Sequence, residues 1–261
     1  MLTKLIKHEM KACSRLLLPL YLVLLVLTIM DKILLSLNIF KGVLGIITGF
    51  FTVVYIMSII AIMAVTTIII ILRFYKNLVT DEGYLMFTLP VTPHELISSK
   101  LISSFIWTML SLIAVLSSIF AVVITGERLK MIPEAIQLTM QELTATFGNL
   151  TALLIIEIIA YFIFAIFCST LIYYASIAVG QLFNGHKVLG SFVAYAGFNI
   201  ISQIIVTVVI LIAGLVFKDT LTDHRYIVTL LLPGLFLYII IFSIIYYAIT
   251  NYIFSKKLNL E

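Results

Sequence analysis

Six long apolar stretches limit the fold of this sequence more than any other feature. They cover residues 16–37, 43–72, 101–125, 150–183, 188–217 and 227–254. A helix needs about 20 apolar residues to cross the hydrocarbon core of a bilayer. None of the stretches alternates between apolar and polar residues as the strands of a membrane barrel do. The sequence therefore predicts an all-α, polytopic membrane protein, with six transmembrane helices in a single transmembrane domain that covers residues 1–261.

The overall composition excludes the main soluble classes. Of the 261 residues, 63% are hydrophobic and 11% are charged, whereas a soluble domain carries roughly a quarter charged residues. A soluble enzyme of this size could not bury so much apolar surface, and disorder requires low hydrophobicity. The two cysteines, Cys13 and Cys168, lie in a basic stretch and an apolar run, which does not fit a disulfide scaffold.

Basic residues are distributed unevenly between the two sets of connecting segments. With the N-terminus in the cytoplasm, the inner segments have a net charge of +5 and the outer segments have none. The inner cations are Lys4, Lys7, Lys11, Arg15, Arg73, Lys76, Lys100, Lys187, Lys256 and Lys257, and the outer ones are Lys32, Lys41, Arg128, Lys130, Lys218 and Arg225. Since Lys and Arg are enriched on the cytoplasmic side, we expect both termini in the cytoplasm and the chain in the cytoplasmic membrane. The same rule explains the net charge of +4 without a nucleic-acid partner.

Residues 1–15 have the pattern of an amphipathic helix. Apolar residues recur at helical spacing on one face, and Lys4, Lys7, Lys11 and Arg15 share the other. This pattern predicts a helix at the cytoplasmic membrane interface, in contact with lipid head groups. Pro19 then marks the turn into the first span, or a kink early in it. The helix anchors the topology or binds a partner, and the two roles are compatible.

The cytoplasmic segment 73–99 carries the densest set of local structural signals. Thr80 or the aspartate that follows it can cap a short helix that ends at Pro90. Thr92 and Glu95 then form a capping box, with a proline at the first helical position, for a second helix that runs into the third span. The short helix is too apolar to stand alone in water. It must dock on the membrane, on the protein's own helices or on a separate partner.

This segment resembles the corresponding loop of the ABC-2 type transporter permeases. From position 81 it reads Asp-Glu-Gly-Tyr-Leu-Met-Phe-Thr-Leu-Pro-Val-Thr, followed by Glu95-Leu96-Ile97 and Ser99-Lys100-Leu101. Those permeases have a Gly-Tyr-rich, Leu-Pro segment at this place, and a lysine opens their third span. The six-helix layout, the basic N-terminal helix and the cytoplasmic termini agree with the family over essentially the whole chain. The short outer loop at 218–226 departs from the larger relatives.

The resemblance implies the permease subunit of an ATP-driven exporter. The segment would hold the coupling helix, which fits a cleft in a separate ABC ATP-binding subunit. Carried over by position, the coupling residues are Asp81, Glu82, Gly83, Tyr84, Leu85, Met86, Phe87 and Leu89. ATP and magnesium would bind to that partner, so this chain would need no cofactor and would not be an enzyme. It would pair with a second copy of itself or with a similar permease. The cargo would be amphipathic: a peptide toxin, a bacteriocin, a hydrophobic drug or a lipid.

Polar side chains share a face in two of the spans. They are Thr48, Thr52, Tyr55 and Thr66 in the second span, and Ser191, Tyr195, Asn199 and Ser202 in the fifth. Such faces avoid lipid, and they either line a cavity or pack on another helix. The family resemblance favours a substrate pathway. Glu157, in the fourth span, has a role either in substrate or ion binding or in packing. It is the one ionisable residue placed inside a span, because Asp31, near the outer end of the first stretch, is counted with the outer segments.

Signatures of catalysis are absent from the sequence. The nearest approach to a phosphate-binding loop, at 180–187, has His186 where a lysine is required. None of the histidines has the spacing of a zinc site, so we expect no metal. Two other functions stay open. One is an ion-coupled secondary carrier, with Glu157 as the coupling residue. The other is a non-transporting membrane scaffold or immunity protein.

Overall fold

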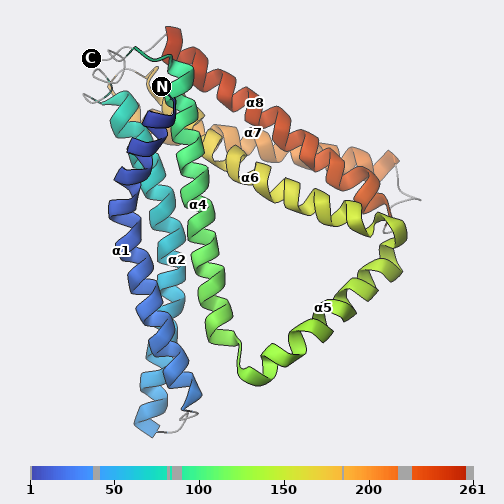
Figure 1. The fold of residues 1–261 in the computed structure, drawn as a ribbon. Helices are drawn as coiled ribbons and strands as arrows, with labels where there is room; N and C mark the ends of the chain where they lie inside the picture. The colour runs from blue at the N-terminus through green and yellow to red at the C-terminus, as the bar shows by residue number, and fades with distance from the viewer. Residues whose placement is uncertain are drawn as a thin grey trace. The chain divides into compact units, whose positions relative to one another are not determined.

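The computed structural model describes residues 2–37, 42–80, 83, 90–183, 185–216 and 225–256. The elements are α1 (Leu2–Ser36), α2 (Gly42–Val79), α4 (Pro93–Val123), α5 (Gly126–Phe147), the 3₁₀ turn η1 (Gly148–Leu150), α6 (Thr151–Gly180), α7 (Lys187–Val216), the π-helical turn η2 (Ile227–Leu231) and α8 (Leu232–Lys256). Among the described residues, six helical stretches are long and apolar enough to cross a membrane (Figure 1). The predicted all-α fold with six candidate spans is confirmed.

The chain divides into two compact units. The first consists of Met1–Phe74 and Ser98–Pro133, and the second consists of Tyr75–Ile97 and Glu134–Glu261. The first unit therefore contains α1, most of α2 and nearly all of α4. The second contains α6, α7 and α8 together with the segment between α2 and α4.

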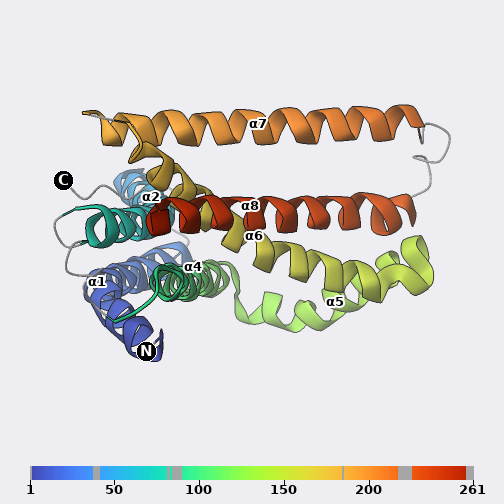
Figure 2. The same cartoon turned by 90° about the horizontal axis from the view of Figure 1, so that it is seen from above.

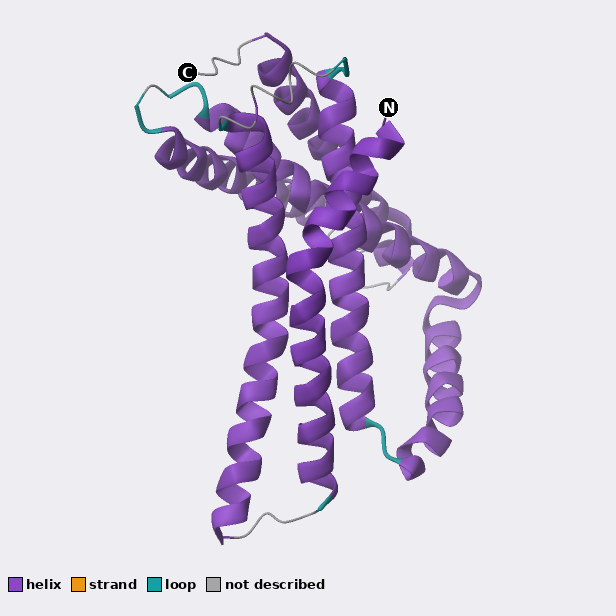
Figure 3. Ribbon diagram, turned by 60° about the vertical axis from the view of Figure 1, so that its left-hand side comes forward, coloured by secondary structure: helices purple, strands orange, loops and turns teal. Residues whose placement is uncertain are grey.

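In the first unit, α1, α2 and α4 lie side by side over most of their length (Figure 3). Two clusters of buried apolar side chains join them. Cys13, Leu17, Ile69 and Trp107 form one, and Leu24, Tyr55, Ile62 and Val115 form the other. Each cluster takes residues from all three helices. Leu17 and Leu24 are seven positions apart, so they fall on the same face of α1. The heptad spacing explains why one stripe of α1 supplies both clusters.

Helix α1 differs from the prediction in one respect. We expected an amphipathic helix at 1–15, with Pro19 at a turn into the first span or at a kink early in it. Helix α1 runs from Leu2 to Ser36 with Pro19 inside it, so there is no turn at Pro19, and the kink stays a prediction. Leu17 on one side of the proline and Leu20 and Tyr21 on the other pack in the same cluster. These contacts hold one helix on both sides of the lost backbone hydrogen bond. The predicted cationic face, Lys4, Lys7, Lys11 and Arg15, is exposed. Its position at a membrane interface stays a prediction.

In the second unit, α6 packs against both α7 and α8 (Figure 2). Gly180 at the end of α6 permits a close approach, because a Cβ there would lie 2.6 Å from the backbone nitrogen of Ser191 in α7. On the other face, Phe164 of α6 makes an edge contact with Phe236 of α8, with ring centroids 5.2 Å apart. Small and aromatic residues thus define the two helix contacts of this unit.

The start of α4 has the predicted capping box. The Glu95 side chain accepts a hydrogen bond from the backbone nitrogen of Thr92 at 3.1 Å, and the Thr92 hydroxyl accepts one from the nitrogen of Glu95 at 3.3 Å. Pro93 is the first helical residue, where its missing N–H costs nothing. These contacts fix where the segment after α2 turns back into a helix.

Candidate functional site

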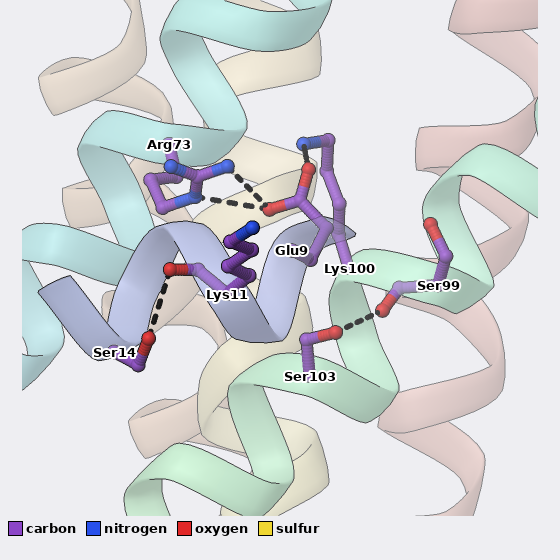
Figure 4. A network of polar contacts seen from close by, with 7 residues as sticks. All are labelled: Glu9, Lys11, Ser14, Arg73, Ser99, Lys100 and Ser103. Atoms are coloured by element: carbon purple, nitrogen blue, oxygen red, sulfur yellow. Dashed lines mark hydrogen bonds and ion pairs between the residues drawn. The ribbon is translucent and has the colours of Figure 1, made fainter. Parts of the chain in front are cut away.

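An ion triad joins the three helices of the first unit. Glu9 of α1 uses both carboxylate oxygens: Oε2 accepts from Arg73 Nε at 3.0 Å and Nη2 at 2.9 Å, and Oε1 accepts from Lys100 Nζ at 2.7 Å (Figure 4). Arg73 belongs to α2 and Lys100 to α4. One carboxylate therefore ties together all three helices.

The triad lies one helical turn beyond an apolar cluster. Glu9 precedes Cys13 by four residues, and Arg73 follows Ile69 by four, so each lies on the face of its helix that the cluster occupies. Lys100 precedes Trp107 by seven residues and shares its face in the same way. This helical spacing places the three charged side chains at the same level of the bundle.

Because the triad is buried, the loss of any contact within it would cost free energy. Glu9 is 7% exposed and Lys100 is 4% exposed, whereas the side chain of Arg73 keeps 24% of its surface in contact with the surroundings. Desolvated charges are tolerated only when they are paired and hydrogen-bonded. Two cations on one carboxylate leave the triad with a formal charge of +1. Arg73, as the more exposed cation, is the one best placed to be solvated.

Two of the nearby hydroxyl groups in Figure 4 donate to carbonyl oxygens of their own helices. Ser14 donates to the carbonyl oxygen of Lys11, and Ser103 donates to that of Ser99, each at 2.8 Å. These serines therefore do not compete with Arg73 or Lys100 for the Glu9 carboxylate.

Two layers of hydroxyl groups continue the polar contacts along the bundle. In the first layer, Ser111 lies 2.6 Å from the Tyr21 hydroxyl and 2.8 Å from the Thr66 hydroxyl. Thr66 also donates to the carbonyl oxygen of Ile62 at 2.7 Å. Because the threonine proton goes to the carbonyl, the chain has one consistent direction: Tyr21 donates to Ser111, Ser111 to Thr66, and Thr66 to the backbone.

The second layer repeats this arrangement. Ser118 lies 2.7 Å from the Tyr55 hydroxyl and 2.9 Å from the Thr28 hydroxyl, and Thr28 donates to the Leu24 carbonyl at 2.6 Å. Each layer takes one residue from α1, one from α2 and a central serine from α4. In both layers every hydroxyl proton has an acceptor, as buried polar groups require.

A buried carboxyl group follows at the end of α1. Asp31 is 1% exposed, and its Oδ1 lies 2.7 Å from the Thr52 hydroxyl of α2. Among the described residues its Oδ2 has no hydrogen-bond partner. Asp31 lies inside α1, five residues before Ser36, and its assignment to the outer side of the membrane stays a prediction. Its position seven residues after Leu24 places it on the buried stripe of the helix.

The polar residues predicted in the second span face this bundle. Thr52, Tyr55 and Thr66 contact α1 or α4 through the hydrogen bonds described above, and Thr48 is 4% exposed. These contacts are those of helix packing within the first unit. A role of the four residues in a substrate pathway stays a prediction.

The residues predicted in the fifth span make fewer contacts between helices. The Tyr195 ring stacks on Tyr173 of α6, with centroids 5.5 Å apart, and Ser202 hydrogen-bonds to Tyr238 of α8. Ser191 and Asn199 instead donate to carbonyl oxygens of their own helix, at 3.0 and 2.8 Å. Tyr195 and Ser202 thus contact neighbouring helices through their side chains, and Ser191 lies against Gly180 of α6. The place of the four residues in a pathway stays a prediction.

Glu157 lies six residues after the start of α6 and is half-buried. Within the described chain its Oε2 has no hydrogen-bond partner. No basic side chain is recorded in contact with it in the described part of the second unit. The alternatives of ion binding and packing stay open for this residue.

The predicted coupling residues fall mostly outside the described residues. This applies to Asp81, Glu82, Tyr84, Leu85, Met86, Phe87 and Leu89. Gly83 is described: its nitrogen donates to the carbonyl of Thr80 at 2.7 Å, and a Cβ on it would lie 2.8 Å from the carbonyl carbon of Leu78. The backbone approaches itself so closely here that only glycine fits without a shift.

Sequence reasoning missed the triad and the hydroxyl layers. A usable signal was present, because Ser104, Ser111 and Ser118 are spaced by seven residues in α4 and all three are buried. Tyr21 and Thr28 have the same spacing in α1. Two heptads of hydroxyl residues on different helices predict a shared polar seam. The pairing of Glu9 with Arg73 and Lys100 could not be read in this way, because the three residues belong to different helices.

Compared with known proteins, the chain matches no protein-family model, no curated protein sequence and no solved structure.

Proposed function

We propose that this chain is the permease subunit of an ABC-2 type exporter in the cytoplasmic membrane. Two copies, or one copy and a similar permease, would bind two ABC ATP-binding subunits through the segment at 81–89. ATP-driven closure of those subunits would move an amphipathic cargo outward. The cargo classes that fit are peptide toxins, bacteriocins, hydrophobic drugs and lipids, and we favour peptides or drugs.

The observation that carries the proposal is that the two helices flanking this segment in the sequence, α2 and α4, are both bound to one carboxylate of α1. Arg73 lies six residues before the end of α2, and Lys100 lies seven residues after the start of α4. Both bind Glu9. A segment that receives force from a partner must continue into helices that are held rigidly together. The triad holds α2 and α4 in this way. The resemblance of residues 81–101 to the permease loop supports the same role.

The proposed mechanism follows from the cost of separating buried charges. Pulling Lys100 away from Glu9 would leave a buried cation without its counterion, which is strongly unfavourable. A push on the segment would therefore displace α1, α2 and α4 together rather than slide one past another. Rigid-body motion of this kind is a common way to transmit a conformational change.

Copurification tests the proposal. The chain is expressed together with the ATP-binding protein encoded beside it, purified in mild detergent and weighed as an intact complex. We expect an assembly with two ATP-binding subunits that is lost when Leu85→Asp places a charge in the apolar docking surface. Leu138→Asp is the matched control, because Leu138 is exposed on α5, outside the segment. This variant should keep the complex.

The same variants separate the other functions. A chain that purifies without any ATP-binding protein, and whose gradient-driven uptake survives Leu85→Asp, would be a secondary carrier. A chain that loses a regulator on Leu85→Asp but shows no transport in any form would be a scaffold. Either result would overturn the exporter proposal.

A further inference from the structure

Helix α5 has an apolar face that the described chain leaves uncovered. The residues of this face recur at spacings of three or four and therefore share one side of the helix: Leu129, Ile132, Ile136, Met140, Leu143 and Phe147. Ile136 is 59% exposed, and none of the α5 side chains that the structure describes is buried. We propose that this face binds the surface of the lipid bilayer and that α5 lies flat on the membrane. The inference does not depend on the exporter proposal, because it requires only that α4 and α6 cross a membrane.

The rest of the α5 surface is mainly polar. Exposed polar side chains cluster on the side away from the apolar face: Lys130, Glu134, Gln137 and Gln141. Met131 and Leu138 also lie outside the apolar face, as single apolar side chains commonly do on a polar surface. A helix with one continuous apolar stripe and a polar remainder has the pattern of a helix in the plane of a membrane interface.

The end of α4 places the start of α5 at the bilayer. Phe120 and Val123, in the last turn of α4, are apolar and exposed, which suits contact with lipid and not with water. Only residues 124–125 separate α4 from α5. Arg128 of α5 also holds this junction, because its Nη1 donates to the carbonyl oxygen of Val123 at 2.9 Å. The first turn of α5 therefore stays close to the end of α4.

The start of α6 places the other end of α5 at the bilayer. Leu153 and Ile156, in the first turns of α6, are also apolar and exposed. Gly148 has φ of 56°, in the left-handed region, and so ends α5 and turns the chain. The Thr151 hydroxyl of α6 contacts the carbonyl oxygens of Leu143 at 3.2 Å and Gly148 at 2.8 Å. The last turn of α5 therefore lies beside the first turn of α6.

These two attachments determine how α5 lies on the membrane. The stretches that contain α4 and α6 are consecutive candidate spans, so the end of α4 and the start of α6 reach the same membrane surface if each crosses once. A helix of 22 residues is about 33 Å long, whereas a link of two or three residues spans roughly 10 Å. An upright α5 would carry one end too far from the surface for its link to return. The helix must therefore lie along the surface, where burial of its apolar face in lipid is favourable.

The charges of α5 indicate which kind of lipid surface it binds. The helix has three acidic residues, Glu127, Glu134 and Glu142, and two basic ones, Arg128 and Lys130, which gives a formal net charge of −1. A surface helix that depends on anionic lipids is rich in Lys and Arg, as residues 1–15 are. Helix α5 therefore binds by burying its apolar face, and a zwitterionic lipid surface is sufficient.

Spin-label accessibility measured on the full-length chain tests the proposal. The free cysteines Cys13 and Cys168 are first replaced by alanine. Single cysteines along α5 then carry a nitroxide label, and the protein is reconstituted in phosphatidylcholine bilayers. Molecular oxygen concentrates in lipid, whereas a charged nickel chelate stays in water. The ratio of the two collision rates therefore reports whether each label faces the bilayer or the solvent.

We expect this ratio to be several-fold higher for Ile136→Cys and Met140→Cys than for Gln137→Cys and Gln141→Cys, which are the matched controls on the polar side. All four side chains are exposed, so the substitutions leave the packing of the chain intact. Neither added phosphatidylglycerol nor high salt should change the pattern, because the helix does not bind through its charge.

Three results would overturn the proposal. If the nickel chelate reaches the labels at positions 136 and 140 as readily as those at 137 and 141, the apolar face lies in water. If both reagents are excluded from 136 and 140, protein covers the face, as a second copy of the chain would. If the oxygen preference appears only with phosphatidylglycerol, the helix binds through charge and not through its apolar face.

Discussion

Replacing Glu9 with glutamine removes the charge that Arg73 and Lys100 share but keeps the shape of the side chain. Lys100, at 4% exposure, would then be a buried cation without an anion among the described residues. Removing one partner of a buried ion pair costs about 3–5 kcal/mol. The glutamine oxygen can still accept one hydrogen bond, so we expect Glu9→Gln to lower the free energy of unfolding by about 3 kcal/mol, the low end of that range.

Removing the cation instead of the anion should lower the free energy of unfolding much less. In Lys100→Met the Glu9 carboxylate keeps both contacts with Arg73, at 3.0 and 2.9 Å, and a buried cation becomes an apolar side chain. We expect a loss of about 1 kcal/mol, the usual net value of a hydrogen bond. The double variant should cost little more than Lys100→Met, because it contains no unpaired buried lysine and the remaining cation, Arg73, is partly exposed. The two substitutions should therefore be non-additive by about 3 kcal/mol.

Equilibrium unfolding in mixed micelles measures these differences, with a denaturing detergent as the titrant and helical signal as the readout. The wild type, both single variants and the double variant complete a mutant cycle. Equal costs for the two single variants, or additive costs in the double variant, would refute the reasoning. Either result would mean that buried Lys100 does not need the Glu9 carboxylate as its counterion.

Two further predictions concern packing between helices. Gly180→Ala should lower the free energy of unfolding by about 1–3 kcal/mol through overpacking, because the new Cβ would lie 2.6 Å from the nitrogen of Ser191. Gly197 has open space around it, so Gly197→Ala should be neutral or slightly stabilising in the same titration. Ser111→Ala should cost about 1 kcal/mol by breaking the centre of a hydroxyl layer. Ser117→Ala, which removes an exposed hydroxyl bonded only to its own helix among the described residues, should have no measurable effect.

The six spans could be predicted because each is a property of a continuous stretch of sequence. Length and apolarity alone decide whether such a stretch can cross a membrane, and the structure confirms the expected number of candidates in the described chain. The capping box at Thr92 and Glu95 was predictable for the same reason, because its donors and acceptors are three residues apart. Features that depend on residues close together in the sequence can thus be predicted from that stretch alone.

Contacts between helices were harder to predict, because the pairing of faces is not encoded in any one stretch. The second-span residues Thr52, Tyr55 and Thr66 were correctly grouped as a polar face, but their partners on α1 and α4 could not be named. Asp31 was counted with the outer segments because it is charged, and its burial within α1 was not predicted. A heptad reading of Leu17, Leu24 and Asp31 would have put the carboxyl on the buried face, since all three are almost completely buried.

The polar seam of the first unit has a consequence for how this bundle can move. The triad and both hydroxyl layers each require a residue from α1, α2 and α4 at the same level. The residues that form them are spaced by 12 and 7 positions in α1 and by 11 and 7 in α4. Sliding one helix by a turn would break all three sets of contacts at once and leave buried polar groups unpaired, at a cost that adds over the layers. The three helices are therefore expected to move as one body. Under the exporter proposal, the conformational change that moves cargo would therefore have to arise outside this bundle.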